Sequence, residues 1–268
     1  MSVPADSFYV RTDGVYHPTS ATAGPWDPGL QHGGPPAALL GMALEATSPR
    51  PDTRIAHFAL DFLSPVSIAP MSLTTEITRP GKKIELLSAT AMIAGRPVLR
   101  AIAWRLAVEQ GRSPEVNQSE PPPPFPDLPE ARLFPDAPPF GYGLALDWRF
   151  SEGGLHLLGP GTAWTRLRVE VVKGEPVSAL ARALAMVDSA NGISAELAPS
   201  TFLFVPVNLT VSLARAPEGE WVGMSAKTWI AGEGVGTTHA RLFDARGYLG
   251  QCMQTLFVER RTPPTRKD

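Results

Sequence analysis

The feature that most constrains the fold of this chain is a proline-dense segment near its middle, at residues 113–139. Proline cannot donate a backbone hydrogen bond to a sheet and breaks the interior of a helix, so this segment is predicted to be a linker with partial polyproline II character. It separates two halves of similar length, each large enough for a domain of its own. We therefore predict an N-terminal domain at 1–110, a linker at 111–140 and a C-terminal domain at 141–268.

The first half reads as one helix followed by strands. Gly33 and Gly34 come before two prolines and the run at 37–46, whose apolar residues recur at helical spacing. Proline suits the first turn of a helix, where its missing N–H would have been unpaired anyway. The run at 54–66 alternates between apolar and polar residues, which is typical of a half-buried strand. Three more strand-like runs follow, separated by turn signals, at 71–79, 83–93 and 97–108.

The second half repeats this plan, with a predicted helix at 176–191. The predicted strands after it lie at 202–214, 220–230, 236–244 and 248–260. Matching turns in the two halves are offset by about 150 residues each time, at Pro65 and Pro217, Gly81 and Gly232, and Gly95 and Gly247. A fixed offset of this kind indicates an internal repeat. Each unit has a candidate extra strand before its helix, at 8–17 and 163–172. Consecutive strands without an intervening helix predict antiparallel sheets, and so an α+β fold.

Composition and motifs exclude several classes of function. A net charge of -2 with no block of Lys and Arg gives no reason to expect nucleic acid. The single cysteine, Cys252, excludes an intrachain disulfide and is compatible with a reducing compartment. No run approaches the roughly 20 apolar residues that a membrane span needs, so we expect a soluble cytoplasmic protein without membrane insertion. The absence of GxSxG and HExxH motifs disfavours a serine hydrolase of the α/β type and a metal site.

Several runs share their order and spacing with a known family. A Gly-Gly pair opens the helix in LQHGGPPAALLGMALEA, and the phrase FLSP ends the strand in HFALDFLSPV. A GEW phrase precedes a long strand in the second half, and QTL closes the last strand. Over roughly 26–108 and 175–259 the chain resembles acyl-CoA thioesterases of the thioesterase II type and the wider thioesterase-like superfamily. The resemblance implies a double hotdog fold, in which two helix-plus-antiparallel-sheet units are fused. It also implies hydrolysis of acyl-CoA thioesters to the free acid and CoA, in lipid metabolism.

The same resemblance implies a polar catalytic cluster in the second half. The family's Asp on the second hotdog helix matches Asp188, and its Gln on the final strand matches Gln254. The family's Ser or Thr position holds Pro206, so the nearby Asn208 and Thr210 are the candidates for a third member. Asp188 would act as general base, or orient a water held jointly with Gln254. Backbone N–H groups near a helix N-terminus would bind the thioester carbonyl oxygen, without a covalent intermediate.

Each candidate also has a purely structural interpretation. Asp188 suits the terminal turn of its helix. Gln254 points outward if its two neighbours in the strand, Met253 and Thr255, point inward. Gly33 and Gly34 are candidates for substrate binding, but their lack of a side chain also lets backbones approach closely. His57 is a substrate-binding candidate by residue type, although the resemblance puts the chemistry in the other half.

Two rival functions follow from the same residues. A non-catalytic acyl or acyl-CoA binding module is favoured by Pro206 in the family's Ser or Thr position. Hydration of an enoyl thioester is disfavoured, because it typically uses an Asp/His pair close together on one hotdog helix and neither predicted helix contains a histidine. The expected partner is an acyl-CoA, with CoA as part of the substrate and no cofactor. Exposed sheet edges and a readily paired sheet face predict a homo-oligomer.

Overall fold

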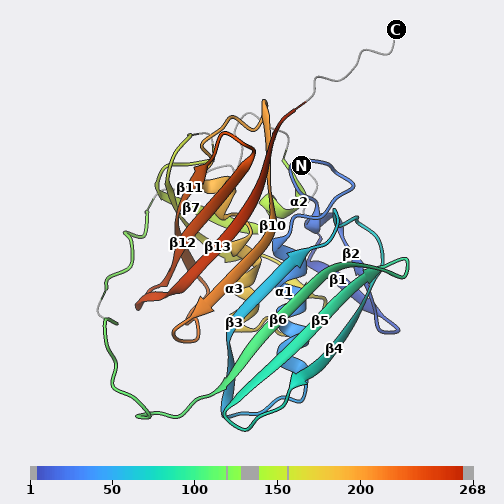
Figure 1. The fold of residues 1–268 in the computed structure, drawn as a ribbon, viewed down its shortest axis with the longest axis vertical. Helices are drawn as coiled ribbons and strands as arrows, with labels where there is room; N and C mark the ends of the chain where they lie inside the picture. The colour runs from blue at the N-terminus through green and yellow to red at the C-terminus, as the bar shows by residue number, and fades with distance from the viewer. Residues whose placement is uncertain (1–4, 119, 128–138, 156, 262–268) are drawn as a thin grey trace.

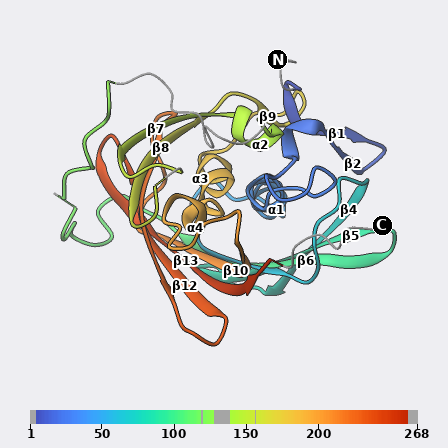
Figure 2. The same cartoon turned by 90° about the horizontal axis from the view of Figure 1, so that it is seen from above.

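The computed structural model describes residues 5–118, 120–127, 139–155 and 157–261. This part of the chain forms one continuous, mostly antiparallel sheet of thirteen strands that curls around its helices (Figures 1 and 2). No helix among the described residues is long and apolar enough to cross a membrane. Part of the predicted linker, at 119 and 128–138, lies outside the described residues.

The predicted helices and long strands are confirmed in both halves. In the first half they are α1 (Gly34–Ala46), β3 (Thr53–Phe62), β4 (Met71–Arg79), β5 (Ile84–Ile93) and β6 (Arg96–Ala107). In the second half they are α3 (Ala179–Val187), β10 (Phe202–Leu213), β11 (Val222–Ile230), β12 (Val235–Asp244) and β13 (Gly247–Arg260).

Shorter elements complete the sheet and its edges. The two candidate extra strands are each split into two, as β1 (Ser7–Thr12) and β2 (Val15–Pro18), and as β8 (Gly161–Leu167) and β9 (Glu170–Val172). Sequence patterns did not predict a 3-10 turn at Ser20–Thr22, the short helix α2 (Gly141–Leu144) or strand β7 (Leu146–Glu152). The second predicted helix is also interrupted, because α3 ends at Val187 and a separate turn, α4 (Ala190–Ile193), follows it.

The two halves meet at the centre of the sheet. The strand order is β7-β8-β11-β12-β13-β10-β3-β6-β5-β4-β2-β1-β9, and β10 pairs antiparallel with β3. Outward from this seam, each half places the first strand after its helix, then the fourth, the third and the second. The halves therefore follow one plan around an approximate twofold relation. The predicted domain limits at 110 and 140 stay predictions.

Helices α1 and α3 lie side by side on the concave face of the sheet (Figure 2). Both are buried along most of their length, as expected for helices that are apolar on nearly all sides. Two glycines of α1 allow the close approach. A Cβ on Gly34 would collide with the backbone oxygen of Ala185, and a Cβ on Gly41 would meet the end of the Leu184 side chain. The N-terminus of α1 therefore lies against the C-terminal turn of α3.

The described part of the predicted linker packs on the second half. The ring of Phe125 meets Trp164 and Trp221 edge-on, at centroid distances of 5.5 Å and 5.0 Å. The indole N–H of Trp164 donates to the carbonyl oxygen of Pro124 at 3.2 Å. This stretch connects the two halves, and these contacts also hold it against the second half.

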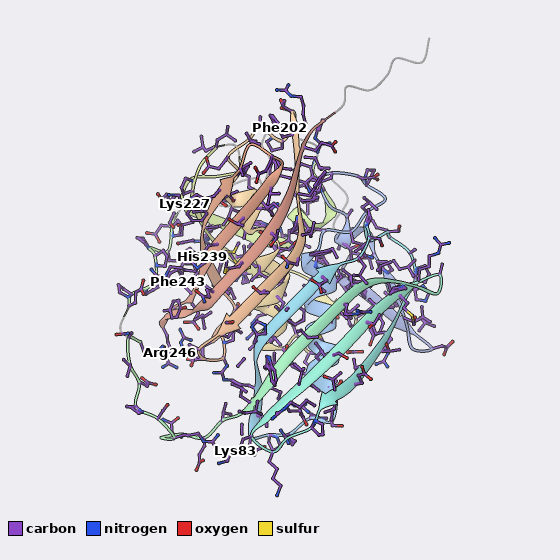
Figure 3. The ribbon with its side chains drawn as sticks, in the orientation of Figure 1. Lys83, Phe202, Lys227, His239, Phe243 and Arg246 are labelled. Carbon is purple, nitrogen blue, oxygen red and sulfur yellow. The ribbon has the colours of Figure 1, made fainter. Side chains whose placement is uncertain are left out.

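The opposite, convex face of the sheet carries many polar side chains. Lys227 on β11 and His239 on β12 stand directly opposite each other there, on the strands where Figure 3 labels them. Their inward-pointing neighbours on both strands are buried, since side chains of a strand alternate between faces.

The two glycines of α1 give a matched test of helix packing. We expect Gly34→Ala to lower the free energy of unfolding by an amount near the upper end of the roughly 1–3 kcal/mol that overpacking costs, because a backbone oxygen cannot move aside easily. We expect Gly41→Ala to stay within about 1 kcal/mol of wild type, because Leu184 can rotate and alanine has a higher helix propensity. Urea denaturation measures both values. Equal losses in the two variants would contradict this account of the helix contact.

Candidate active site

A cavity of about 380 Å³ lies between the two halves, at the meeting point of α1 and α3. Its walls are mainly apolar and aromatic, which suits the apolar part of a small-molecule ligand. The apolar and aromatic residues that line it include Trp26, Leu30, Phe62, Val66, Phe140, Trp148, Leu155, Leu203, Val205, Pro206 and Val207. Its polar lining includes His32, Asp188 and Asn191.

Asp188 is the C-terminal cap of α3 and faces this cavity from a buried position. Its Oδ2 accepts a hydrogen bond from the backbone N–H of Gly33 at 2.9 Å, across the interface of the two halves. Its Oδ1 is buried and has no hydrogen-bond partner among the described residues. Burial raises the pKa of Asp188 to about 7, although the Gly33 hydrogen bond acts in the opposite direction. The site thus contains an acid that titrates near neutrality and has one open acceptor.

His32 contacts the same carboxyl group, and sequence analysis did not single it out. Its Nδ1 lies 3.2 Å from Oδ2 of Asp188 and accepts a hydrogen bond from the backbone N–H of Gly34 at 3.1 Å. The imidazole stacks on the ring of Tyr142, with centroids 3.7 Å apart and planes within 5° of parallel. Burial lowers the pKa of His32 to about 3, so the ring is neutral near pH 7 and its contact with Asp188 is not an ion pair.

Gln254 points inward from β13 and is buried, whereas its neighbour Met253 is half exposed. Its Oε1 accepts a hydrogen bond from the backbone N–H of Asn191 at 3.0 Å, and its Nε2 donates to the backbone oxygen of Asp188 at 3.2 Å. The Asn191 side chain in turn donates to the backbone oxygen of Phe204 at 3.0 Å. The side chain of Gln254 therefore holds the backbone of the turn between α3 and α4. It contacts the main-chain oxygen of Asp188 and not the carboxyl group of that residue.

The structure does not bring Asn208 and Thr210 to Asp188. A register shift in the pairing of β10 with β13 lies between Pro206 and Asn208, so one extra residue enters β10 there. Pro206 lines the cavity, but after the bulge Leu209 is the buried residue, and Asn208 and Thr210 point to the convex face. The expectation that one of them completes the catalytic cluster therefore has no support in the geometry.

The structure also places His57 away from the cavity. Its Nδ1 lies 3.0 Å from the Oγ of Ser212, in the pairing of β3 with β10 and on the convex face. This contact joins the two halves of the sheet, which agrees with the structural interpretation of His57.

Gly33 and Gly34 lie at the site, but their backbone N–H groups are occupied by Asp188 and His32. Pro35 and Pro36 have no N–H, and the N–H of Ala37 donates to the oxygen of Gly33 at 3.1 Å. The N-terminus of α1 therefore offers no open backbone donor for a thioester carbonyl, contrary to the simplest expectation for such a helix end.

Other chemistries find little support in the described residues. No three His, Cys, Asp or Glu side chains of this part of the chain come together in a way that would hold a metal ion. Cys252 is buried beneath the end of α3, with Sγ 3.8 Å from the backbone oxygen of Val187. Burial raises the pKa of its thiol, which disfavours the reactive thiolate.

Comparison with known proteins identifies the family. A model of the acyl-CoA thioesterase N-terminal domain matches residues 22–106, and a model of the C-terminal domain matches residues 117–258. The chain belongs to the acyl-CoA thioesterase family. Membership places it among enzymes that hydrolyse thioesters. A search of curated proteins finds no match.

Solved structures agree with the family in fold. A protein assigned as a thioesterase from Novosphingobium aromaticivorans is 22% identical, with a TM-score of 0.70 over 94% of this chain and 99% of its own. A protein of unknown function with a hot dog fold from Alicyclobacillus acidocaldarius is 16% identical, with a TM-score of 0.68 over 96% and 97%. An acyl-CoA thioesterase II from Mycobacterium marinum is 18% identical, with a TM-score of 0.64 over 96% and 95%. The chain therefore has the fold of hotdog thioesterases.

The raised pKa of Asp188 predicts a pH-dependent cost to stability. Its ordinary value is 3.8, so the protonated carboxyl stabilises the folded state at low pH, and this contribution is lost as the pH rises through about 7. In Asp188→Asn, the amide oxygen still accepts the Gly33 N–H and no charge forms. We expect the free energy of unfolding of the variant to rise relative to that of wild type between about pH 4 and pH 7. The gain is roughly 4 kcal/mol at most, from about 1.4 kcal/mol per pKa unit. Urea denaturation over this range measures the difference, and a difference that does not change with pH would contradict the raised pKa.

Proposed function

We propose that this protein hydrolyses acyl-CoA thioesters through a water molecule held by Asp188, and that its two helix-plus-sheet units are two fused hotdog domains. The observation that carries the proposal is the buried Oδ1 of Asp188, which has no partner among the described residues and belongs to a side chain lining an apolar cavity. A buried polar atom of this kind normally has a hydrogen-bond partner. A water molecule at Oδ1 would supply one.

The chemistry follows from the properties of this carboxyl group. In its ionised form Asp188 accepts a proton from the bound water while the water oxygen attacks the thioester carbonyl carbon. The tetrahedral intermediate then breaks its C–S bond, and the proton returns from Asp188 to the thiolate sulfur of CoA. A carboxyl with a pKa of about 7 is well matched to both proton transfers, because an efficient general base titrates near the working pH.

Gln254 acts in this scheme as a positioning residue. Its amide is bound to the main chain on both sides of the turn between α3 and α4, at Asp188 and at Asn191. These two hydrogen bonds fix the point at which α3 ends, and so the direction in which the carboxyl points. Water held jointly by the side chains of Asp188 and Gln254 is therefore less well supported than water held by Asp188 alone.

The cavity supports an acyl group as the bound moiety. Trp26, Phe62 and Trp148 are among the side chains that surround it, and an apolar wall of this kind favours a fatty or aromatic acyl chain. The family supports CoA as the carrier. Association into a homo-oligomer and a cytoplasmic location stay predictions.

Specific observations favour two rival functions. Pro206 lines the cavity in the position where the family has a Ser or Thr, which favours a module that binds acyl-CoA without hydrolysing it. The contact of His32 with Asp188 brings an Asp/His pair together from the two halves, although neither helix contains a histidine. This pair keeps hydration of an enoyl thioester as a further alternative.

Thiol release from a panel of short, long and aromatic acyl-CoAs tests the proposal directly. We expect turnover by wild type and a fall in kcat of about 100-fold or more in Asp188→Asn, since general-base catalysis contributes typically 10²–10⁴-fold. Asp61→Asn is the matched control, because Asp61 is an exposed carboxylate on β3. It is expected to keep wild-type activity.

Each other result of this assay has a separate meaning. No thiol release, with binding seen as a thermal shift on adding acyl-CoA, would favour the binding module. With an enoyl-CoA added to the panel, loss of its enoyl chromophore without thiol release would favour hydration. Full turnover by Asp188→Asn would leave the family intact and refute the assignment of Asp188.

The pH profile gives an independent check on the same residue. Only the ionised carboxylate can accept the proton of water, so kcat/KM is expected to rise with pH and to level off above an inflection near 7. The profile should lose this inflection in Asp188→Asn, measured on its residual activity at high enzyme concentration. An inflection near 4 in wild type would contradict the raised pKa.

A further inference from the structure

Thioester hydrolysis needs a hydrogen-bond donor for the carbonyl oxygen, which gains negative charge as water attacks. Two expected sources of that donor are missing at this site. The N–H groups at the start of α1 are occupied or absent, as described above for Gly33 to Ala37. The strand position where the family has a hydroxyl holds Pro206, which has neither a hydroxyl nor an N–H. The donor must therefore come from another group that lines the cavity.

Two groups face Nδ1 of His32: the N–H of Gly34 at 3.1 Å, which can only donate, and Oδ2 of Asp188 at 3.2 Å. We assign the neutral ring the tautomer in which Nδ1 accepts from Gly34 and Nε2 carries the proton. Nε2 makes no hydrogen bond to any described residue, and His32 lines the cavity. The imidazole therefore has one free N–H donor, in direct contact with the carboxyl that would hold the water.

The position of this ring is fixed by Tyr142. The two rings are stacked in parallel, and the Tyr142 hydroxyl donates to the backbone oxygen of Ala185 at 2.8 Å. The same hydroxyl lies 2.7 Å from the Oγ of Ser189, next to Asp188 in the chain. His32 and Asp188 are thus both anchored to the C-terminal turn of α3. A donor fixed before the reaction stabilises developing charge without a cost of reorganisation.

We propose that His32 is a second catalytic residue, whose Nε2–H donates a hydrogen bond to the thioester carbonyl oxygen in the transition state. This inference rests on the proposed function. No proton leaves His32: water loses its proton to Asp188, the carbonyl oxygen is stabilised by Nε2–H, and the proton on Asp188 passes to the leaving thiolate. Nδ1 remains bonded to Gly34 throughout, which keeps the required tautomer.

Trp148 is the main competitor for this role. It lines the cavity, and its Nε1 is buried without a hydrogen-bond partner among the described residues. Trp148 packs edge-on against Tyr142, with ring centroids 6.2 Å apart, whereas His32 touches the Asp188 carboxyl itself. The carbonyl carbon has to lie next to the water on Asp188, so the donor that contacts Asp188 is the better placed.

Three substitutions of His32 separate a donor at Nε2 from a packing role. The amide nitrogen of Gln reaches the place of Nε2 of histidine, and the amide nitrogen of Asn reaches the place of Nδ1. Phe keeps an aromatic ring but has no hydrogen-bond donor. We expect His32→Phe and His32→Asn to lose about 100-fold or more in kcat, as for loss of an oxyanion donor, with KM within about threefold of wild type. We expect the kcat of His32→Gln to be at least tenfold higher than that of His32→Phe or His32→Asn. The inflection of kcat/KM near pH 7 should remain in His32→Gln, because Asp188 and Gly33 are intact.

Trp148→Phe is the parallel variant, since it removes a second N–H, that of a buried indole in the cavity wall without a partner among the described residues. A loss in kcat in Trp148→Phe, with His32→Phe unaffected, would overturn the assignment in favour of the tryptophan. Equal activity in the Gln, Asn and Phe variants of His32 would also overturn it, even if all three were slow, because a packing role predicts no advantage for Gln. A thermal melt of each variant identifies any that fails to fold, and the comparison of Gln with Asn then decides the question.

The failure of this inference is distinguishable from that of the proposed function. If wild type releases thiol and Asp188→Asn does not, but His32→Phe keeps its kcat, only the role of His32 is refuted. If wild type releases no thiol from any acyl-CoA, the proposed function and the role of His32 fall together.

Discussion

The antiparallel pairing of β3 with β10 is the constraint on which the rest of this structure depends. Each of these strands is the first after the helix of its own half, so joining them places α1 and α3 side by side and antiparallel. The start of one helix then lies against the end of the other. Gly34 permits this contact because any side chain there would collide with the backbone of α3. The cavity forms at this junction, and the His–Asp pair in its wall comes from chain positions 32 and 188.

The junction also determines the electrostatics of the site. It removes Asp188 from water and gives its carboxyl one compensating hydrogen bond, from the backbone N–H of Gly33, beside a neutral imidazole. A full positive charge nearby would favour the ionised form and lower the pKa of the carboxyl, which would make it a weaker base. The same burial keeps His32 neutral, so that its ring serves as a hydrogen-bond donor and not as a counterion. The buried carboxyl thus lowers the stability of the fold near neutral pH, and in return the site contains an acid that changes charge there.

The sequence was sufficient to predict the repeated helix-and-strand plan, because both periodicities and the turn residues are local signals. It also pointed to Asp188 and Gln254, through a family resemblance and the alternation of β13, and their catalytic roles stay proposals. It did not identify His32, whose role depends on a contact with a residue far away in the chain and on a turn where no periodicity applies. Asn208 and Thr210 lie away from Asp188 for another reason. Both share the even spacing of Pro206, and only the bulge between Pro206 and Asn208, which sequence spacing does not reveal, turns them outward.

The approximate twofold plan has a second helix junction, where the end of α1 meets the start of α3. Glu45 stands there, hydrogen-bonded to Ser178, and burial raises the pKa of its carboxyl as well. The two junctions thus carry different acids in different settings. An assembly of two identical single units would have to place the same residues at both. A single chain with two different halves has no such obligation, since codons for the two halves change separately. One junction can then specialise in chemistry while the other is selected for holding the helices together.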